Sequence, residues 1–168
     1  DYLALSFIRR PADILKLKER LAQGKRDTPV IAKLEKPMAI ANLDAIMDVC
    51  EGVMVARGDL GVEMAPEKVP VIQKHIIAEA NKRGKVVITA TQMLESMIEQ
   101  PSPTRAEATD VYNAVRDGTD AIMLSGETSV GKFPFRAVNA MTRIAKRAES
   151  YLEYPMLAER HRASAKKG

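Results

Sequence analysis

The sequence holds little cysteine and no long apolar run. Cys50 is the single cysteine, so no internal disulfide can form and a reducing compartment is expected. No uninterrupted apolar stretch approaches the roughly 18 residues that a membrane-spanning helix needs. The first residues, Asp1 to Ala4, include no basic segment of the kind that opens a signal peptide. These absences favour a cytoplasmic protein without a membrane partner.

An initiator methionine is also missing. The chain begins at Asp1, and a strand-like run starts at Tyr2. Its 168 residues are enough for one ordinary domain or for part of a larger one. We therefore expect a piece of a longer chain.

Excess positive charge is confined to the end of the chain. Residues 1–142 hold 19 basic and 19 acidic side chains, whereas residues 143–168 hold seven basic and three acidic ones. A nucleic-acid groove would need basic residues gathered within the folded domain. We therefore expect no nucleic-acid partner. The hydrophobic content of 46% is high enough to argue against intrinsic disorder.

Short β-prone runs alternate with helical patterns as far as residue 150. The runs are Tyr2–Phe7, Pro29–Leu34, Gly52–Val55, Val86–Ala90 and Asp120–Leu124. Such repeated units predict an α/β fold with parallel strands and right-handed crossovers. Either an open doubly wound sheet or about five βα units of a TIM (β/α)₈ barrel fits. The absence of a G-x-G-x-x-G motif after the first strand weakens the dinucleotide-binding form of the open sheet.

Helix boundaries follow local chemistry. Pro11 suits a first helical turn. Thr104 and Glu107 form a capping-box pattern, in which each side chain satisfies the other's free backbone N–H. Gly84 and Gly118 each stand where a helix ends before the next strand.

Reactive side chains gather at the carboxyl ends of the expected strands. They are Ser6, Lys33, Glu35, Gly58, Asp59, Thr91, Ser125 and Glu127. The steps between Ser6, Lys33, Asp59, Thr91 and Ser125 are 27, 26, 32 and 34 residues. Parallel strands bring such ends to one face, where folds of this kind build their sites. This convergence predicts a single ligand site.

Lys33 and Glu35 are two positions apart, so on an extended strand both side chains point the same way. The lysine suits an anionic substrate and the glutamate suits a metal ion. Glu35 and Asp59 together would offer the hard oxygens that Mg²⁺ prefers. The alternatives are a surface ion pair for Lys33 and Glu35, and a helix-capping carboxylate for Asp59.

Gly58 permits close backbone approach, and the amides that open the following helical turn attract an anion. Thr89 and Thr91 are expected to share one face of their strand, with hydroxyls that bind a carboxylate or position a water. The alternative is that threonine is present only as a strand former. Ser125 and Glu127 supply a hydroxyl and an acid, but no G-x-S-x-G nucleophile motif surrounds them.

Six segments together are recognisable. They are Ala4–Arg9, Ala32–Pro37, Gly52–Glu63, Ala90–Ile98, Pro103–Glu107 and Ile122–Thr128. In these segments, residues 1–150 resemble the second part of the catalytic (β/α)₈ barrel of pyruvate kinase. The resemblance implies a partial barrel domain that lacks the first barrel strands and the lid domain. Residues 151–168 would then be a basic tail or linker toward a missing C-terminal domain.

The resemblance implies the glycolytic reaction of phosphoenolpyruvate and ADP to pyruvate and ATP, with Mg²⁺ or Mn²⁺. By the motif match, Lys33 would stabilise charge on the transferring phosphoryl group, and Glu35 and Asp59 would hold the metal. The substrate carboxylate would bind the amides of Gly58 and Asp59 and the hydroxyl of Thr91. A K⁺ ion is also implied, with its site mostly outside this chain.

The same match places Thr91, Ser125 and Glu127 near the water chain that protonates the enolate. Pro103–Glu107 resembles a stretch near a subunit interface, which implies a homo-oligomer. One alternative is a catalytically incomplete fragment that binds metal and anion weakly or only assembles with other chains. Another is an aldolase-like barrel that stabilises a metal-bound enolate, although Ala90–Ile98 and Ile122–Thr128 point away from it.

Overall fold

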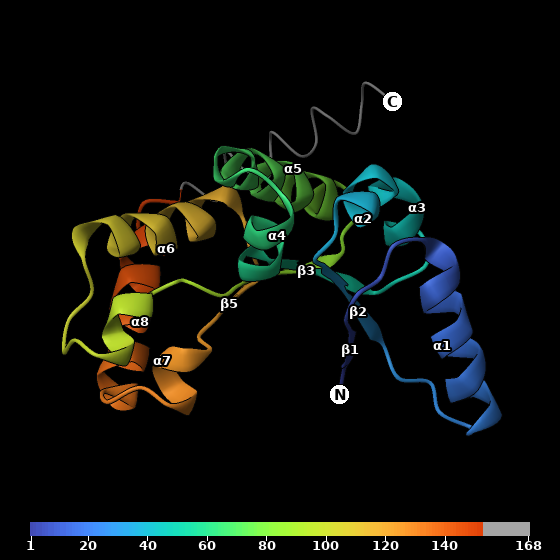
Figure 1. Ribbon diagram of the computed structural model, residues 1–168, viewed down its shortest axis with the longest axis horizontal. Coiled ribbons are helices and arrows are strands. Elements are labelled where there is room, and N and C mark those ends of the chain that lie inside the picture. Colours follow the sequence, from blue (N-terminus) through green and yellow to red (C-terminus); the bar gives the residue numbers. More distant parts are fainter. Residues whose placement is uncertain (153–168) are drawn as a thin grey trace. The chain divides into compact units, whose positions relative to one another are not determined.

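The computed structural model describes residues 1–152 and divides the chain into two compact units. The first unit is Asp1–Thr91 and the second is Gln92–Gly168. Strands and helices alternate along the chain in both, as the colours of Figure 1 show from blue to red.

Four strands form the parallel sheet of the first unit. They are β1 (Leu3–Leu5), β2 (Val30–Leu34), β3 (Gly52–Ala56) and β4 (Val86–Ala90), paired in that order. A fifth strand, β5 (Ala121–Met123), lies in the second unit. All five overlap the runs expected from the sequence, and the α/β fold class is confirmed.

The helices of the first unit follow the strands in sequence. They are α1 (Pro11–Gln23), α2 (Pro37–Ala41), α3 (Leu43–Met47), α4 (Arg57–Glu63), the 3₁₀ turn η1 (Pro66–Lys68) and α5 (Val69–Lys82). Pro11 opens α1, and Gly84 follows α5 with a φ of 61°, so both boundary predictions are confirmed. Among the residues described, no helix combines the length and apolarity that crossing a bilayer would take.

One face of this sheet packs against helices. Alternate residues of β2, namely Val30, Ala32 and Leu34, are fully buried in one core with Ile46 of α3 and Ile76 of α5. Burial of each large aliphatic side chain contributes about 1.5–3 kcal/mol, so this layer fixes which way β2 faces. Because side chains alternate across a strand, Lys33 lies on the opposite face.

Gly52 sits where β3 approaches its neighbours closely. A Cβ built at this position would lie 2.6 Å from Ile31 Cδ1 and 2.7 Å from the Val86 carbonyl oxygen. Both distances are shorter than real Cβ contacts. Only glycine therefore allows β2, β3 and β4 their observed register at this point.

The second unit has its own hydrophobic core. Its remaining elements are η2 (Glu95–Ile98), α6 (Arg105–Asp117), α7 (Gly126–Ser129) and α8 (Pro134–Glu149). The buried residues are Met93, Leu94, Met97, Val111, Ala114, Ala137, Ala140 and Met141. Thr104 and Glu107 form the predicted capping box at the start of α6, and Gly118 ends the helix with a φ of 99°.

Candidate functional site

Lys33 is held at the carboxyl end of β2 by two side chains. Its ammonium group lies 2.6 Å from Glu35 Oε1 and donates a hydrogen bond to Ser6 Oγ 2.8 Å away. Ser6 follows β1, the strand that pairs with β2. The sequence-based prediction that Lys33 and Glu35 point the same way is therefore consistent with the structure.

The Lys33–Glu35 pair is not a surface ion pair. Glu35 is only 1% exposed, while a quarter of the Lys33 side chain (25%) still reaches solvent. The backbone N–H of Phe7 donates to Glu35 Oε2 at 2.8 Å, so both oxygens of this carboxylate have partners. A buried, paired charge at a strand end costs desolvation and is more typical of a ligand site than of a solvated surface.

Gly58 and Thr91 meet although 33 residues separate them. The Gly58 backbone N–H donates to Thr91 Oγ1 at 2.8 Å, and the Thr91 hydroxyl donates to the Ala90 carbonyl oxygen at 2.7 Å. Gly58 lies in the first turn of α4, where N–H groups lack intrahelical acceptors. The hydroxyl and the helix amides together form a set of donors suited to a carboxylate.

The Arg57 side chain binds the Thr91 backbone. Its Nε and Nη2 donate to the Thr91 carbonyl oxygen at 3.1 and 2.7 Å, and its Nη1 lies 3.4 Å from Gln73 Oε1 of α5. The Arg57 and Gln73 side chains are both buried. Arg57 lies within the Gly52–Glu63 segment recognised from the sequence, and nothing in that segment reveals a carbonyl partner 34 residues away.

Unusual backbone conformations occur at the same strand ends. Phe7, Thr91 and Gln92 have positive φ values of 58°, 69° and 54° although none is glycine. Such conformations cost about 1–3 kcal/mol each and cluster at ligand sites. The expectation that Thr91 shares a strand face with Thr89 is wrong, because β4 ends at Ala90 and the left-handed Thr91 directs its own hydroxyl.

Asp59 offers an exposed carboxylate in the first turn of α4. Across residues 1–152 this carboxylate makes no hydrogen bond or ion pair, so it does not cap the helix through a side-chain bond. Leu34 lies opposite Val55 in the register, which brings Glu35 level with the strand end that leads into α4. The two carboxylates are hard oxygen donors of the kind that suits Mg²⁺ with water and substrate oxygens as further ligands. No group of three or more potential metal-binding side chains occurs in the described part of the chain.

Ser125 and Glu127 belong to the second unit. Glu127 is buried, and its two oxygens accept hydrogen bonds from the backbone N–H groups of Leu94 and Ser125, at 3.0 and 2.8 Å. The carboxylate thereby ties the segment after Thr91 to the turn that follows β5. These contacts give Glu127 a clear structural role.

Comparison with known proteins matches the chain to one family. A family model described as pyruvate kinase, barrel domain, matches residues 1–138. A pyruvate kinase of Clostridium perfringens is 55% identical over 161 residues, which cover 95% of this chain and 34% of that protein. Pyruvate kinase 2 of Synechocystis is 55% identical over 164 residues, covering 98% of this chain and 28% of that protein.

A solved structure agrees with the sequence comparisons. The crystal structure of a pyruvate kinase from Cryptosporidium parvum matches with a TM-score of 0.96 and 46% identity, over 98% of this chain and 35% of the other. The fold class expected from the sequence, a stretch of a (β/α)₈ barrel, is thus confirmed. The chain spans about a third of the length of the relatives that it matches.

Proposed function

Because the chain belongs to the pyruvate kinase family, we propose that it carries part of a site converting phosphoenolpyruvate and ADP to pyruvate and ATP. The observation that carries the proposal is the Lys33 ammonium group, held between Ser6 and the buried Glu35 on the face of the sheet opposite the helices. Phosphoryl transfer depends chiefly on positioning and charge neutralisation. A fixed cation with solvent access supplies both.

The substrate carboxylate would bind at the start of α4. Its oxygens would accept hydrogen bonds from the N–H groups of Gly58 and Asp59 and from the Thr91 hydroxyl. The Gly58 N–H now donates to Thr91 Oγ1, so a carboxylate binding there would take over that hydrogen bond. The exchange keeps these partly buried donors satisfied, and the helix start favours a negatively charged acceptor.

Glu35 and Asp59 would hold the divalent ion, Mg²⁺ or Mn²⁺. When bound, this ion would neutralise charge on the oxygens of the phosphoryl group. Glu35 is already oriented by Phe7 and Lys33. Asp59, free of protein partners within the described residues, can turn toward an ion without breaking a contact.

Proton delivery to the enolate carbon is assigned to Thr91, Ser125 and Glu127. In this proposal the hydroxyls of Thr91 and Ser125 orient the water that donates the proton. Glu127 shapes the turn that presents Ser125, as its hydrogen bond from the Ser125 N–H supports.

The remaining elements of the proposal concern the longer protein. We propose that residues 1–150 are a partial barrel domain and that residues 151–168, most of which lie outside the described residues, are a linker. The longer protein would act in the cytoplasm as a homo-oligomer and would use K⁺ bound mostly by residues outside this chain. The second candidate function, an incomplete fragment that binds metal and anion weakly, is favoured by the chain's spanning only a third of its relatives.

The test is a coupled pyruvate-forming assay on this chain with phosphoenolpyruvate, ADP, Mg²⁺ and K⁺, beside its mass in solution. Turnover that Lys33→Met abolishes supports the proposal. Without turnover, Mn²⁺ and phosphoenolpyruvate binding decide: binding that needs Asp59 and Thr91 supports the incomplete fragment. If neither ligand bound, both candidate functions would be rejected for this chain.

A further inference from the structure

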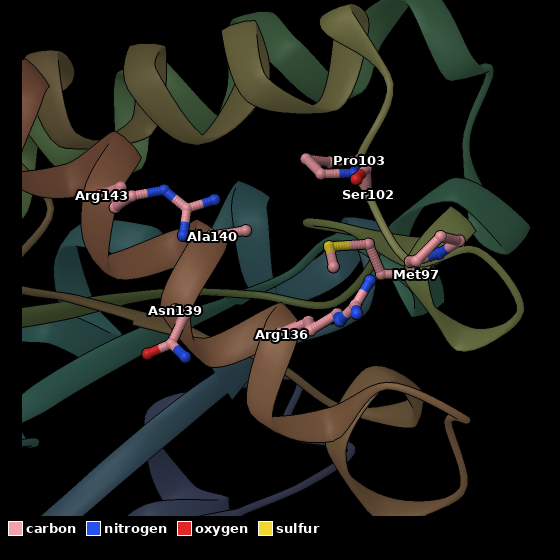
Figure 2. A pocket seen from close by; sticks show the side chains of 8 residues that line it. Met97, Ser102, Pro103, Arg136, Asn139, Ala140 and Arg143 are labelled. Atoms are coloured by element: carbon pink, nitrogen blue, oxygen red, sulfur yellow. The ribbon is translucent and has the colours of Figure 1, made fainter.

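A pocket of about 280 Å³ lies in the second unit, against the first half of α8. Arg136, Asn139 and Arg143 line it from the helix, and Met97, Ser102 and Pro103 line it from the segment between η2 and α6. Figure 2 shows these side chains, with the two arginines projecting from positions about two turns apart on α8. No residue of the proposed phosphotransferase site contributes to it.

The arginines form a stripe along α8. Positions 136, 143 and 147 are seven and eleven residues apart, and at about 100° per residue they fall within roughly 40° of one another around the helix. Arg143 also lines a second hollow of about 380 Å³, together with Arg147 and with Arg105 of α6. The two hollows therefore share one guanidinium group.

These positive charges are not neutralised within residues 1–152. Arg105, Arg136 and Arg143 make no ion pair with any described carboxylate, and the Arg136 guanidinium lies over the Phe133 ring, 5.7 Å from the ring centre. Glu107, the acid nearest to Arg105 on α6, accepts hydrogen bonds from Ser96 and Thr104 instead. The local field thus favours an anion.

We infer that this pocket binds a small phosphate monoester. Planar guanidinium groups bind phosphate oxygens through paired hydrogen bonds, and two of them border the same hollow. Asn139 and Ser102 also line the hollow with polar side chains, and Pro103 offers an apolar surface to the carbon skeleton. The hollow of about 280 Å³ lies just below the roughly 300–1,000 Å³ of pockets for drug-sized ligands, which suits a ligand of a few carbons.

Titration of the ¹⁵N-labelled 168-residue chain at constant ionic strength tests the inference. The ligands are glycerol phosphate, inorganic phosphate and succinate. The chloride concentration is lowered as each ligand is added, so that the ionic strength stays constant. Glycerol phosphate is expected to saturate, shifting the amides of Ser102 and Asn139. The double variant Arg136→Gln with Arg143→Gln should weaken glycerol phosphate binding by at least about tenfold. Arg143→Lys should weaken it severalfold, because an ammonium group lacks the paired, planar N–H donors of a guanidinium group.

The matched control is Arg20→Gln, which removes one exposed arginine from α1 in the first unit and should change the affinity less than about twofold. Equal weakening in Arg20→Gln, shifts that do not saturate, or unchanged affinity in the double variant would overturn the inference. Tighter binding of succinate than of glycerol phosphate would overturn the assignment to phosphate. None of these readouts requires turnover, so the outcome is independent of the proposed function.

Discussion

The Gly58 backbone N–H donates to the Thr91 hydroxyl at 2.8 Å, which joins the first turn of α4 to the end of β4. A Cβ at Gly58 would lie 3.3 Å from Thr91 Oγ1 and 3.7 Å from Thr91 Cβ. The contact thus leaves little room for a side chain. It also places a hydroxyl and a helix amide where one carboxylate could accept from both.

Substitution of Gly58 should disturb this contact. Gly58→Ala is expected to push Thr91 Oγ1 away by a few tenths of an ångström, and the weakened hydrogen bond, at about 0.5–1.5 kcal/mol, should cancel the gain in the free energy of unfolding that alanine brings to a helix. Phosphoenolpyruvate binding should weaken as well. Gly61→Ala is the control in the same helix, because nothing lies within 4 Å of its Cβ and alanine favours a helix by about 0.5–1 kcal/mol. Urea unfolding and ligand titration measure both variants; equal behaviour would contradict the prediction.

Arg57 positions the Thr91 backbone. Arg57→Lys keeps the charge but cannot donate twice to the Thr91 carbonyl, so the turn at Thr91 and Gln92 should open more often. We expect a loss of about 1–3 kcal/mol in stability and faster amide hydrogen exchange at Gln92. In Arg83→Lys, where the arginine pairs at the surface with Asp44 and Asp48, the loss should stay below about 1 kcal/mol. Unchanged exchange at Gln92 would show that Arg57 does not hold this turn.

Loss of Lys33 should leave Glu35 as a poorly compensated buried charge. Lys33→Met is expected to lower the free energy of unfolding at neutral pH by roughly 1–3 kcal/mol, since the lysine is partly exposed. Lys33→Met combined with Glu35→Gln should recover part of this loss, because the remaining group is neutral. Urea unfolding of the single and double variants gives the coupling energy. Additive effects would mean that the two side chains do not interact in solution.

Asp59 is predicted to be a metal ligand. Asp59→Asn should weaken Mn²⁺ binding by about tenfold or more, because an amide oxygen replaces a charged donor. Glu67→Gln, which removes an exposed acid from η1 nearby in the sequence, is the control and should leave the affinity unchanged. Mn²⁺ titration followed by water-proton relaxation measures both. Superimposable curves for Asp59→Asn and the parent would exclude Asp59 from the site.

Glu107 should make the second unit sensitive to acid. Burial raises the pKa of its carboxyl, but hydrogen bonds from Ser96 and Thr104 outweigh this and hold the pKa below the usual 4.5. Because the pKa is lower in the folded state, the carboxylate contributes stability above about pH 4.5 that is lost as the pH falls through the folded value.

Glu107→Gln should therefore lose about 1–2 kcal/mol near pH 7 and show a flatter decline in stability below pH 4.5. Thermal unfolding between neutral and acidic pH measures the difference. Parallel pH profiles for the variant and the parent would refute the proposed contribution of Glu107.

The sequence by itself determined the five strands approximately and several of the helix boundaries. Apolar β-prone runs predicted all five strands, and the capping pattern of Thr104 with Glu107 and the glycine at 118 predicted both ends of α6. These features depend on local backbone preferences and on hydrogen bonds between near neighbours, so residue order is sufficient. The common orientation of Lys33 and Glu35 likewise follows from strand alternation.

Only the tertiary structure decided the contacts between strand ends. Lys33 donates a hydrogen bond to Ser6, 27 positions away, and Arg57 donates to the Thr91 carbonyl, 34 positions away. The burial of Glu35 likewise depends on segments that are distant in the sequence. The left-handed turn at Thr91 was also beyond the sequence pattern, since neither it nor Gln92 is glycine and surrounding contacts must hold them there. Parallel pairing determines which strand ends lie side by side. Packing and hydrogen bonding between the side chains at those ends then determine their burial and orientation.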